Sequence, residues 1–339
     1  MGDDVGHRQG QDEVKVEIGG TAMERRTIPA CGMEVSVVGI GCNNFGGRND
    51  AEQTKAIIHK ALDLGITLFD TADIYTRMSN GSSETMLGQF LGERRKDIIL
   101  ATKFGLPFNG DQTKKGGSRR YVKLAVEDSL KRLRTDWIDL YQLHKPDPTT
   151  PIEETLRALD DLIREGKVRY VGCSNFAGWQ IAEAEFTARE LGINRFVSNQ
   201  SEYSLLNRAV EAEVLPPLAK YGMGFLPYFP LASGVLTGKY RPGQAKPTGT
   251  RLSNPGELAD HFLRDDFIAL ADQLRVFAEA RGHTLLELAF SWLAAKPVIW
   301  SIIAGASSPA QLEQNVKAAG WALSGDDLAE VDRILKGNR

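Results

Sequence analysis

Short apolar runs and helical patterns alternate along most of this chain of 339 residues. The apolar runs are rich in β-branched residues and nearly continuous, as expected for strands of a parallel sheet covered on both faces. Between them, apolar residues recur at helical spacing, for example at Val122, Val126, Leu130 and Leu133. The pattern predicts strands at residues 37–41, 66–69, 98–101, 137–141, 169–172, 196–198, 224–227 and 300–303.

The number of strand–helix alternations predicts the architecture. Eight alternations in one chain fit a closed α/β barrel, the (β/α)8 or TIM barrel, better than an open doubly wound sheet. Residues 229–265 are expected to form a long loop after the seventh strand, and further helices are expected at about 266–281 and 324–335. Long loops in compact domains are usually functional. We therefore expect one barrel domain over residues 23–339, with extra C-terminal helices.

Two segments are candidates for a secretion signal or a membrane span, and neither fits. Residues 1–22 are polar and aperiodic, so they offer little apolar surface to offset ordering entropy, and we expect a flexible N-terminal extension. They also lack the apolar core of a secretory signal. The longest apolar stretch, residues 285–306, contains Glu287 and Lys296 and is split by Pro297. A buried helix followed by a buried strand explains it better than a membrane span.

Charge and cysteine usage narrow the function classes. The 41 Lys plus Arg and 44 Asp plus Glu give a net charge of −3, without the excess of basic residues that nucleic acids or an anionic membrane surface would require. Cys31, Cys42 and Cys173 are widely spaced, so neither a metal site nor a disulfide framework is indicated. This usage fits a reducing, cytoplasmic location. Of five histidines only His144 follows a predicted strand, so a metal-dependent barrel hydrolase, a further alternative, is not favoured.

The polar residues that follow the predicted strands are candidates for catalysis, because barrel active sites form at the carboxyl ends of the strands. Asp70 ends the second strand, Lys103 ends the third and His144 follows the fourth, with Tyr75 on the loop between the second strand and the next helix. Each alone is more often structural, as a helix cap, a solvated lysine or a hydrogen-bonded core histidine. Together they converge on one end of the barrel.

Carbonyl reduction gives this set a chemical meaning, because it requires hydride at carbon and a proton at oxygen. A tyrosine, with an ordinary pKa of about 10, is a usable acid. We expect the Lys103 cation to lower the pKa of Tyr75, and Asp70 to keep Lys103 charged. A neutral His144 could donate a hydrogen bond to the carbonyl oxygen and stabilise developing negative charge.

Six motifs in order carry a family resemblance, at residues 69–75, 129–133, 139–144, 171–176, 231–240 and 305–309. From residue 23 to about 335 the chain resembles the aldo-keto reductase superfamily, and most nearly its bacterial branch similar to potassium-channel β subunits. The resemblance implies an NADP(H)-using barrel with a catalytic tetrad of Asp70, Tyr75, Lys103 and His144. Channel β subunits depart from the tetrad at the histidine, and this chain does not, which favours catalysis.

The resemblance also implies a cofactor site. It places the nicotinamide carboxamide at Ser174, Asn175 and Gln200, and the ring against Tyr228. A Rossmann site is not indicated, because the third glycine of the dinucleotide fingerprint is missing after Gly41. The other implied cofactor contacts are Gly41, Cys42 and Asn43 beneath the nicotinamide ribose, Leu231, Ser233, Gly238, Lys239 and Arg251 at the pyrophosphate, Gly305, Ser307, Gln311, Gln314 and Asn315 at the 2′-phosphate and adenine, and also Asp70, Phe229 and Pro230. Lys239 and Arg251 are also expected to supply positive charge to the 2′-phosphate.

Two departures from the family pattern bear on this site. Phe229 replaces a small serine, which reshapes the pocket near the pyrophosphate, and Gln311 replaces an arginine of other branches, so fewer charges face a 2′-phosphate. The sequence thus predicts an NADPH-dependent oxidoreductase that reduces an aldehyde or ketone to the alcohol, with Tyr75 as proton donor. The alternative is a cofactor-binding regulatory subunit with little turnover. The expected partner is a small carbonyl compound; its identity, the physiological direction and a homo-oligomeric state are left open.

Overall fold

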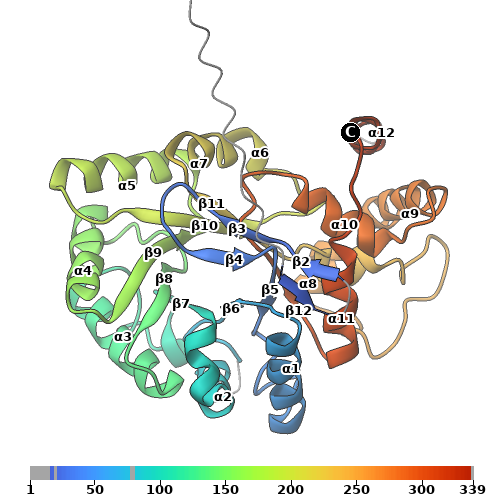
Figure 1. Cartoon of the computed structure of the whole chain (residues 1–339). Helices are drawn as coiled ribbons and strands as arrows, with labels where there is room; N and C mark the ends of the chain where they lie inside the picture. Colours follow the sequence, from blue (N-terminus) through green and yellow to red (C-terminus); the bar gives the residue numbers. More distant parts are fainter. Residues whose placement is uncertain (1–15, 19–20, 77–80, 337–339) are drawn as a thin grey trace, which may run out of the picture.

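Eight parallel strands form the centre of the molecule (Figure 1). The computed structural model describes residues 16–18, 21–76 and 81–336. Within them the sheet order is β11-β10-β9-β8-β7-β6-β5-β12, and a bridge between Phe225 and Ile299 joins its two edges. The predicted (β/α)8 barrel is therefore confirmed. The strands are β5 (Val38–Gly41), β6 (Leu68–Asp70), β7 (Ile99–Phe104), β8 (Ile138–Leu143), β9 (Val168–Ser174), β10 (Phe196–Glu202), β11 (Gly224–Tyr228) and β12 (Ile302–Gly305).

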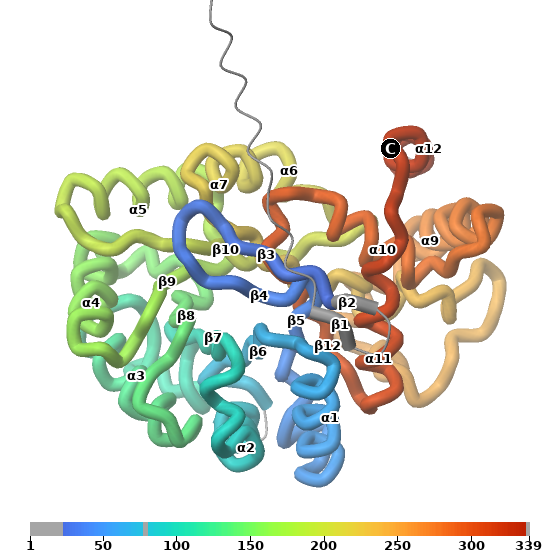
Figure 2. The backbone as a smooth tube through the Cα atoms, in the orientation of Figure 1, coloured from blue at the N-terminus to red at the C-terminus, as the bar shows by residue number. Residues whose placement is uncertain are grey.

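Helices surround the sheet, and the path of the chain around it can be followed in Figure 2. Each contributes an apolar face, as in α4, where Leu156, Leu159 and Leu162 are buried. The helices that follow the barrel strands are α1 (Ala51–Asp63), α2 (Ser82–Phe90), α3 (Arg119–Leu133), α4 (Ile152–Arg164), α5 (Gly178–Leu191), α6 (Val210–Glu213), α7 (Leu215–Tyr221), α10 (Leu285–Ala294) and α11 (Pro309–Ala318).

The segments outside the repeat are also found. The extra helices are α9 (Asp265–Glu279) and α12 (Gly325–Lys336), close to their predicted positions. The region after β11 is less irregular than predicted, because it contains the short helices η3 (Ala232–Thr237) and α8 (Glu257–Phe262). Two further 3-10 turns are η1 (Gly92–Asp97) and η2 (Phe108–Gly110). The apolar stretch 285–306 becomes α10 and β12, and no helix among the described residues is long and apolar enough to cross a membrane.

Two hydrophobic cores hold the barrel. The larger one lies between the strands and the helices, and the smaller one fills the barrel interior with residues such as Leu68, Leu140 and Leu226. Side chains of a strand alternate between these two sides. In β8, for example, Leu140 points inward and Tyr141 outward. This alternation decides which polar side chains at the strand ends enter the barrel.

A hairpin that the hydropathy pattern did not predict closes the amino-terminal end of the barrel. It consists of β3 (Arg25–Thr27) and β4 (Glu34–Ser36), and lies across the strands in Figure 1. The Trp300 indole donates to the Arg26 carbonyl at 3.0 Å, and the Arg26 guanidinium donates to the Ala294 carbonyl at 2.6 Å. Since the active end of a barrel is the opposite one, the hairpin leaves the site open.

A second antiparallel hairpin precedes it, formed by β1 (Val16–Ile18) and β2 (Thr21–Met23). The predicted boundary at residue 23 falls inside β2. The predicted flexibility of the N-terminal extension falls mainly on residues 1–15, which lie outside the described residues.

Candidate active site

The buried ammonium of Lys103 organises the carboxyl end of the barrel. Lys103 lies on β7 and points inward because Ala101, two residues earlier, faces the interior core. Its Nζ donates to Asp70 Oδ2 at 2.6 Å, to the Thr71 carbonyl at 2.9 Å and to the Tyr75 hydroxyl at 3.1 Å. Lys103 is fully buried and Asp70 is 2% exposed. Three of the four predicted catalytic residues are thus in direct contact.

The second oxygen of the Asp70 carboxylate is held by two glutamines. Gln200 Nε2 donates to Asp70 Oδ1 at 2.9 Å, and Gln142 Nε2 donates to it at 3.2 Å. Gln142 was not among the predicted site residues. Gln142 lies two residues after the inward-facing Leu140 on β8, and this spacing could have indicated that its side chain points into the barrel. These hydrogen bonds fix the orientation of the Asp70 carboxylate and satisfy its oxygens in a buried position.

The protonation states follow from burial and from the charges on hand. Burial lowers the pKa of Lys103, but the Asp70 carboxylate and Tyr75 outweigh it and hold that pKa above its ordinary value. Burial is also the largest influence on Tyr75 and raises its pKa, while the Lys103 cation acts in the opposite direction. The net shift is upward, so the predicted lowering of the Tyr75 pKa is wrong for this state. Tyr75 is a protonated phenol at neutral pH.

The His144 ring lies near Tyr75, with 6.0 Å between ring centroids and an edge-to-face angle of 75°. Burial, and then the positive charges of Lys103 and Lys145, hold the pKa of His144 well below 6.5. The backbone is fixed by a bond from the His144 amide to the Phe104 carbonyl at 2.8 Å. Ring atom Nδ1 is buried and has no hydrogen-bond partner in the part of the chain that the structure describes. His144 is a neutral imidazole with unused hydrogen-bonding capacity.

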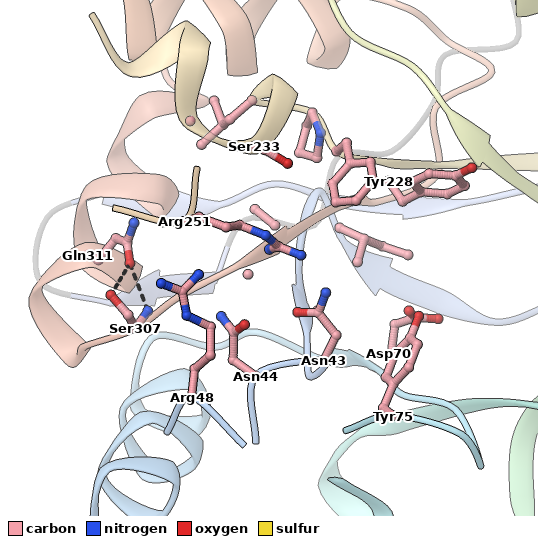
Figure 3. Close-up of a pocket in the computed structure, with 18 of the residues that line it drawn as sticks. Asn43, Asn44, Arg48, Asp70, Tyr75, Tyr228, Ser233, Arg251, Ser307 and Gln311 are labelled. Carbon is pink, nitrogen blue, oxygen red and sulfur yellow. Dashed lines mark hydrogen bonds between the residues drawn. The ribbon is translucent and has the colours of Figure 1, made fainter. Parts of the chain in front are cut away.

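A cavity of about 510 Å³ opens beside these residues (Figure 3). Its size is in the usual range for a site that takes a small molecule. Most of the predicted site residues line it: Gly41, Asn43, Asp70, Tyr75, His144, Ser174, Asn175, Gln200, Tyr228, Phe229, Pro230, Leu231, Ser233, Lys239, Arg251, Gly305, Ser307 and Gln311. Lys103 and Cys42 are buried behind its wall. Gly238, Gln314 and Asn315 do not line it.

The loop after β11 has a strained backbone where it borders the cavity. Positive φ angles occur at Phe229 (52°), Ala232 (47°) and Ser233 (54°), a backbone conformation that residues other than glycine rarely adopt. Such strain concentrates at ligand sites. Ser233 Oγ is buried without a partner among the described residues. Gly234 lets the loop fold against Lys239, whose Nζ would be 2.8 Å from a Cβ at this position.

Positive charge dominates the cavity wall. Arg48, Lys145, Lys239 and Arg251 line it, whereas its only lining carboxylate in the described chain is Asp70, which is already paired with Lys103. None of the four lining cations forms an ion pair with another described residue. An anion, and a multiply charged one in particular, would therefore be stabilised here.

A protein-family model described as the aldo/keto reductase family matches residues 37–336. This chain belongs to that family. Relatives that are similar over most of their length support this assignment to the family. A probable voltage-gated potassium channel subunit beta of Oryza sativa subsp. japonica is 38% identical over 305 residues, covering 87% of this chain and 91% of that protein. The uncharacterized oxidoreductase YrpG of Bacillus subtilis is 36% identical over 325 residues, covering 93% and 97%.

A further relative is the L-glyceraldehyde 3-phosphate reductase of Escherichia coli (strain K12), which is 34% identical over 324 residues, covering 92% of both chains. As an aldo/keto reductase with oxidoreductase relatives, the chain is an oxidoreductase that acts with a nicotinamide cofactor on small carbonyl compounds.

At the end of the cavity near His144, amide and hydroxyl groups suit a nicotinamide carboxamide. Gln200 uses its amide nitrogen on the carboxylate described above and keeps its carbonyl oxygen for an incoming N–H donor. Ser174 Oγ accepts from Asn175 Nδ2 at 3.0 Å and keeps its O–H to donate. Asn175 is more fully engaged, because Nδ2 also donates to the His144 carbonyl and Oδ1 accepts from the Tyr228 hydroxyl at 2.8 Å. Gln200 and Ser174 have the free capacity.

At the far end, the start of α11 suits a phosphate less completely than expected. The Ser308 hydroxyl caps the helix by accepting from the Gln311 backbone N–H at 3.2 Å. Ser307 donates from its backbone N–H at 2.7 Å and from its hydroxyl at 2.9 Å, both to Gln311 Oε1 (dashed in Figure 3). The donors expected to bind a 2′-phosphate are therefore occupied by a neutral side chain. The first turn of α11 contributes no positive charge.

Several lining residues were not predicted from the sequence. Asn44 and Arg48 lie on the loop after β5, and Lys145 follows His144. A charged residue in a polar loop resembles any solvated surface residue, so the sequence pattern offered no signal for Arg48. No group of three or more His, Cys, Asp or Glu residues in the described ranges is placed to hold a metal ion.

Proposed function

We propose that this aldo/keto reductase is an NADPH-dependent carbonyl reductase in which Tyr75 is the proton donor. The observation that supports this most strongly is the chain of contacts from Asp70 through buried Lys103 to the Tyr75 hydroxyl, at 2.6 and 3.1 Å. This chain ends on a protonated phenol at the wall of the cavity. The neutral His144 ring lies across from it.

In the proposed reaction an aldehyde or ketone becomes an alcohol. A nicotinamide cofactor held by Ser174 and Gln200 would supply the hydride for the carbonyl carbon. The Tyr75 hydroxyl donates its proton to the carbonyl oxygen, so that its O–H bond breaks as the new O–H bond forms. His144 donates a hydrogen bond to the same oxygen and stabilises the charge that develops on it.

Lys103 and Asp70 act through Tyr75. When Tyr75 gives up its proton, the phenolate is left 3.1 Å from the Lys103 ammonium, which stabilises it. Asp70 keeps the ammonium charged in a fully buried position, where an unpaired cation would be costly. Solvent then restores the proton of Tyr75 after product release.

The preference for NADPH is supported by the charges of the cavity wall. A dinucleotide with a 2′-phosphate is the more highly charged of the two nicotinamide cofactors. Four cations line the cavity, Arg48, Lys145, Lys239 and Arg251, and none of them has a carboxylate partner among the described residues. Charge-assisted hydrogen bonds to phosphate contribute about 1.5–3 kcal/mol each.

The proposal is tested by mixing the purified protein with NADPH and an aromatic aldehyde and following the absorbance of the reduced cofactor. The expected result is oxidation of NADPH with formation of the alcohol in equal amounts. Aliphatic, sugar and steroid carbonyls extend the screen. If NADPH binds and quenches protein fluorescence, but no carbonyl compound in the screen is reduced, the chain is instead a cofactor-binding regulatory subunit. Its relatives include both a probable voltage-gated potassium channel subunit beta and a reductase.

A further inference from the structure

Arg48 lies at the end of the cavity that contains Ser307 and Gln311, and it was not among the predicted site residues. It belongs to the loop between β5 and α1, is exposed and lines the cavity. No carboxylate among the described residues forms an ion pair with it. A long cation on a polar loop is usually free to move in solvent, so its location matters only if the loop itself is fixed.

This loop is held against α11 by the residue that follows Arg48. Buried Asn49 donates from Nδ2 to the Ser307 carbonyl at 3.2 Å, and its backbone N–H donates to the Asn44 carbonyl at 3.0 Å. The Gly46 amide donates to the Asn49 carbonyl at 3.0 Å. Arg48 is therefore adjacent in sequence to a residue that is bonded directly to the segment preceding α11.

The start of α11 lacks a cation of its own. Ser307 is bonded to the neutral Gln311 side chain, and the first turn of the helix has no basic residue. In Figure 3 the Arg48 side chain extends into the cavity between the Ser307–Gln311 pair on one side and Arg251 on the other. The view therefore places a cation from another loop beside this neutral pair.

The charges on both sides of the cavity repel one another in the absence of an anion. Burial first, and then the positive charge of Arg48, lowers the pKa of both Lys239 and Arg251. The loop after β5 and the loop after β11 therefore present like charges across the same space. An anionic group between them removes this repulsion and gains charge-assisted hydrogen bonds.

We propose that Arg48 recognises the 2′-phosphate of NADP(H) and determines the preference for it over NAD(H), in place of a cation on α11. This inference rests on the proposed function only in that the cavity binds a nicotinamide dinucleotide. Arg48 approaches the phosphate from the β5–α1 loop, with Asn49 as the residue that positions it. Gln311 contributes its amide group and no charge.

The test uses binding and needs no turnover. Isothermal titration calorimetry measures the affinity for adenosine 2′,5′-bisphosphate and for adenosine 5′-monophosphate, which differ by the 2′-phosphate. The wild type is expected to prefer the bisphosphate by about tenfold or more. In Arg48→Gln this ratio falls to near one, whereas affinity for the monophosphate is unchanged. Lys131→Gln, which removes an exposed positive charge from α3 away from the cavity, is the matched control and keeps the wild-type ratio.

A second variant tests the same idea in the opposite direction. In Arg48→Gln combined with Gln311→Arg, a cation on α11 replaces the missing one and frees the donors of Ser307, so the preference for the bisphosphate is expected to return. Raising ionic strength should reduce the ratio in the wild type more than in Arg48→Gln.

Three results would overturn the proposal. One is an unchanged ratio in Arg48→Gln, and another is an equal loss of affinity for both nucleotides, which would place Arg48 at a phosphate common to both. The third is a wild type without preference for the bisphosphate. The proposed reductase activity is judged separately, because NADPH oxidation by the wild type can succeed or fail independently of these ratios.

Discussion

Replacing Tyr75 with phenylalanine should abolish carbonyl reduction and leave the fold and cofactor binding intact. The change removes one oxygen and the 3.1 Å bond from Lys103. General acid catalysis contributes about 10²–10⁴ in rate, so kcat should fall by that factor, equivalent to about 3–5 kcal/mol of activation free energy. Lys103 keeps its bonds to Asp70 and to the Thr71 carbonyl. Because Tyr75 lines the cavity, water can replace the lost hydroxyl, and stability should change by less than about 1.5 kcal/mol.

The assay compares this variant with Tyr203→Phe, which removes a tyrosine hydroxyl elsewhere. The Tyr203 hydroxyl donates to Glu211 at 2.6 Å, and the Tyr203 side chain is fully buried and does not line the cavity. Tyr203→Phe should keep the activity and lose about 1–3 kcal/mol of unfolding free energy, measured by urea denaturation. Tyr75→Phe should show the reverse pattern, with unchanged NADPH quenching of protein fluorescence. If Tyr75→Phe keeps more than about a tenth of the wild-type kcat, the assignment of Tyr75 as proton donor is wrong.

Three further predictions concern protonation and burial. Burial keeps the pKa of Tyr75 above 10 and that of His144 well below 6.5. We therefore expect kcat/KM for reduction to stay level from about pH 7 to 10 and to fall only above pH 10, where the Tyr75 proton donor ionises. An inflection of the pH profile near 6.5 would contradict this. Lys103→Met should be nearly inactive and about 3–5 kcal/mol less stable than the wild type. The double variant with Tyr75→Phe should be little less active than either single variant, measured at a temperature where all remain folded. If the two losses of activity multiply, Lys103 and Tyr75 have independent roles. Glu84→Gln should lose about 3–5 kcal/mol in urea denaturation, because it removes a buried charge that pairs at 2.7 Å with the partly exposed Arg132; a change below about 1 kcal/mol would show that the pair is not important for stability.

The barrel could be predicted from the sequence because its strands are buried on both sides. A continuous apolar run such as residues 98–101 is recognisable without knowledge of its neighbours. The hairpin of β3 and β4 was missed because each strand has three residues, too few to show a period. Its stability comes from Trp300 and other residues far along the chain, which no local pattern reveals.

The site could be predicted only as far as strand order determines it. Asp70 and Lys103 lie near the carboxyl ends of neighbouring strands of the barrel, so their contact could be expected. The upward shift of the Tyr75 pKa could not be predicted from the sequence. It depends on the balance between burial of the phenol and its distance from the Lys103 charge, and both are known only from the structure. Arg48 was missed for a similar reason, since its position depends on the bond between Asn49 and Ser307, which are 258 residues apart.

The short motif at residues 69–75 contains two buried carboxyl groups with different surroundings. Asp70 ends β6 on the inward side, where Lys103 and two glutamines hold it as a paired carboxylate. Asp73 is three residues later and buried, where burial and then the charge of Glu84 hold its pKa well above 3.8. Glu84 in turn pairs with Arg132 and accepts from Thr102.

The loop that carries Tyr75 is held to Lys103 at two points. At the first, the Asp70 carboxylate accepts from the Lys103 ammonium at 2.6 Å, and that ammonium also donates to the Tyr75 hydroxyl. At the second, the Asp73 backbone N–H donates to the Lys103 carbonyl at 3.0 Å. Lys103 therefore fixes the loop as well as the phenol, which keeps the proposed proton donor beside the cation that would stabilise its phenolate.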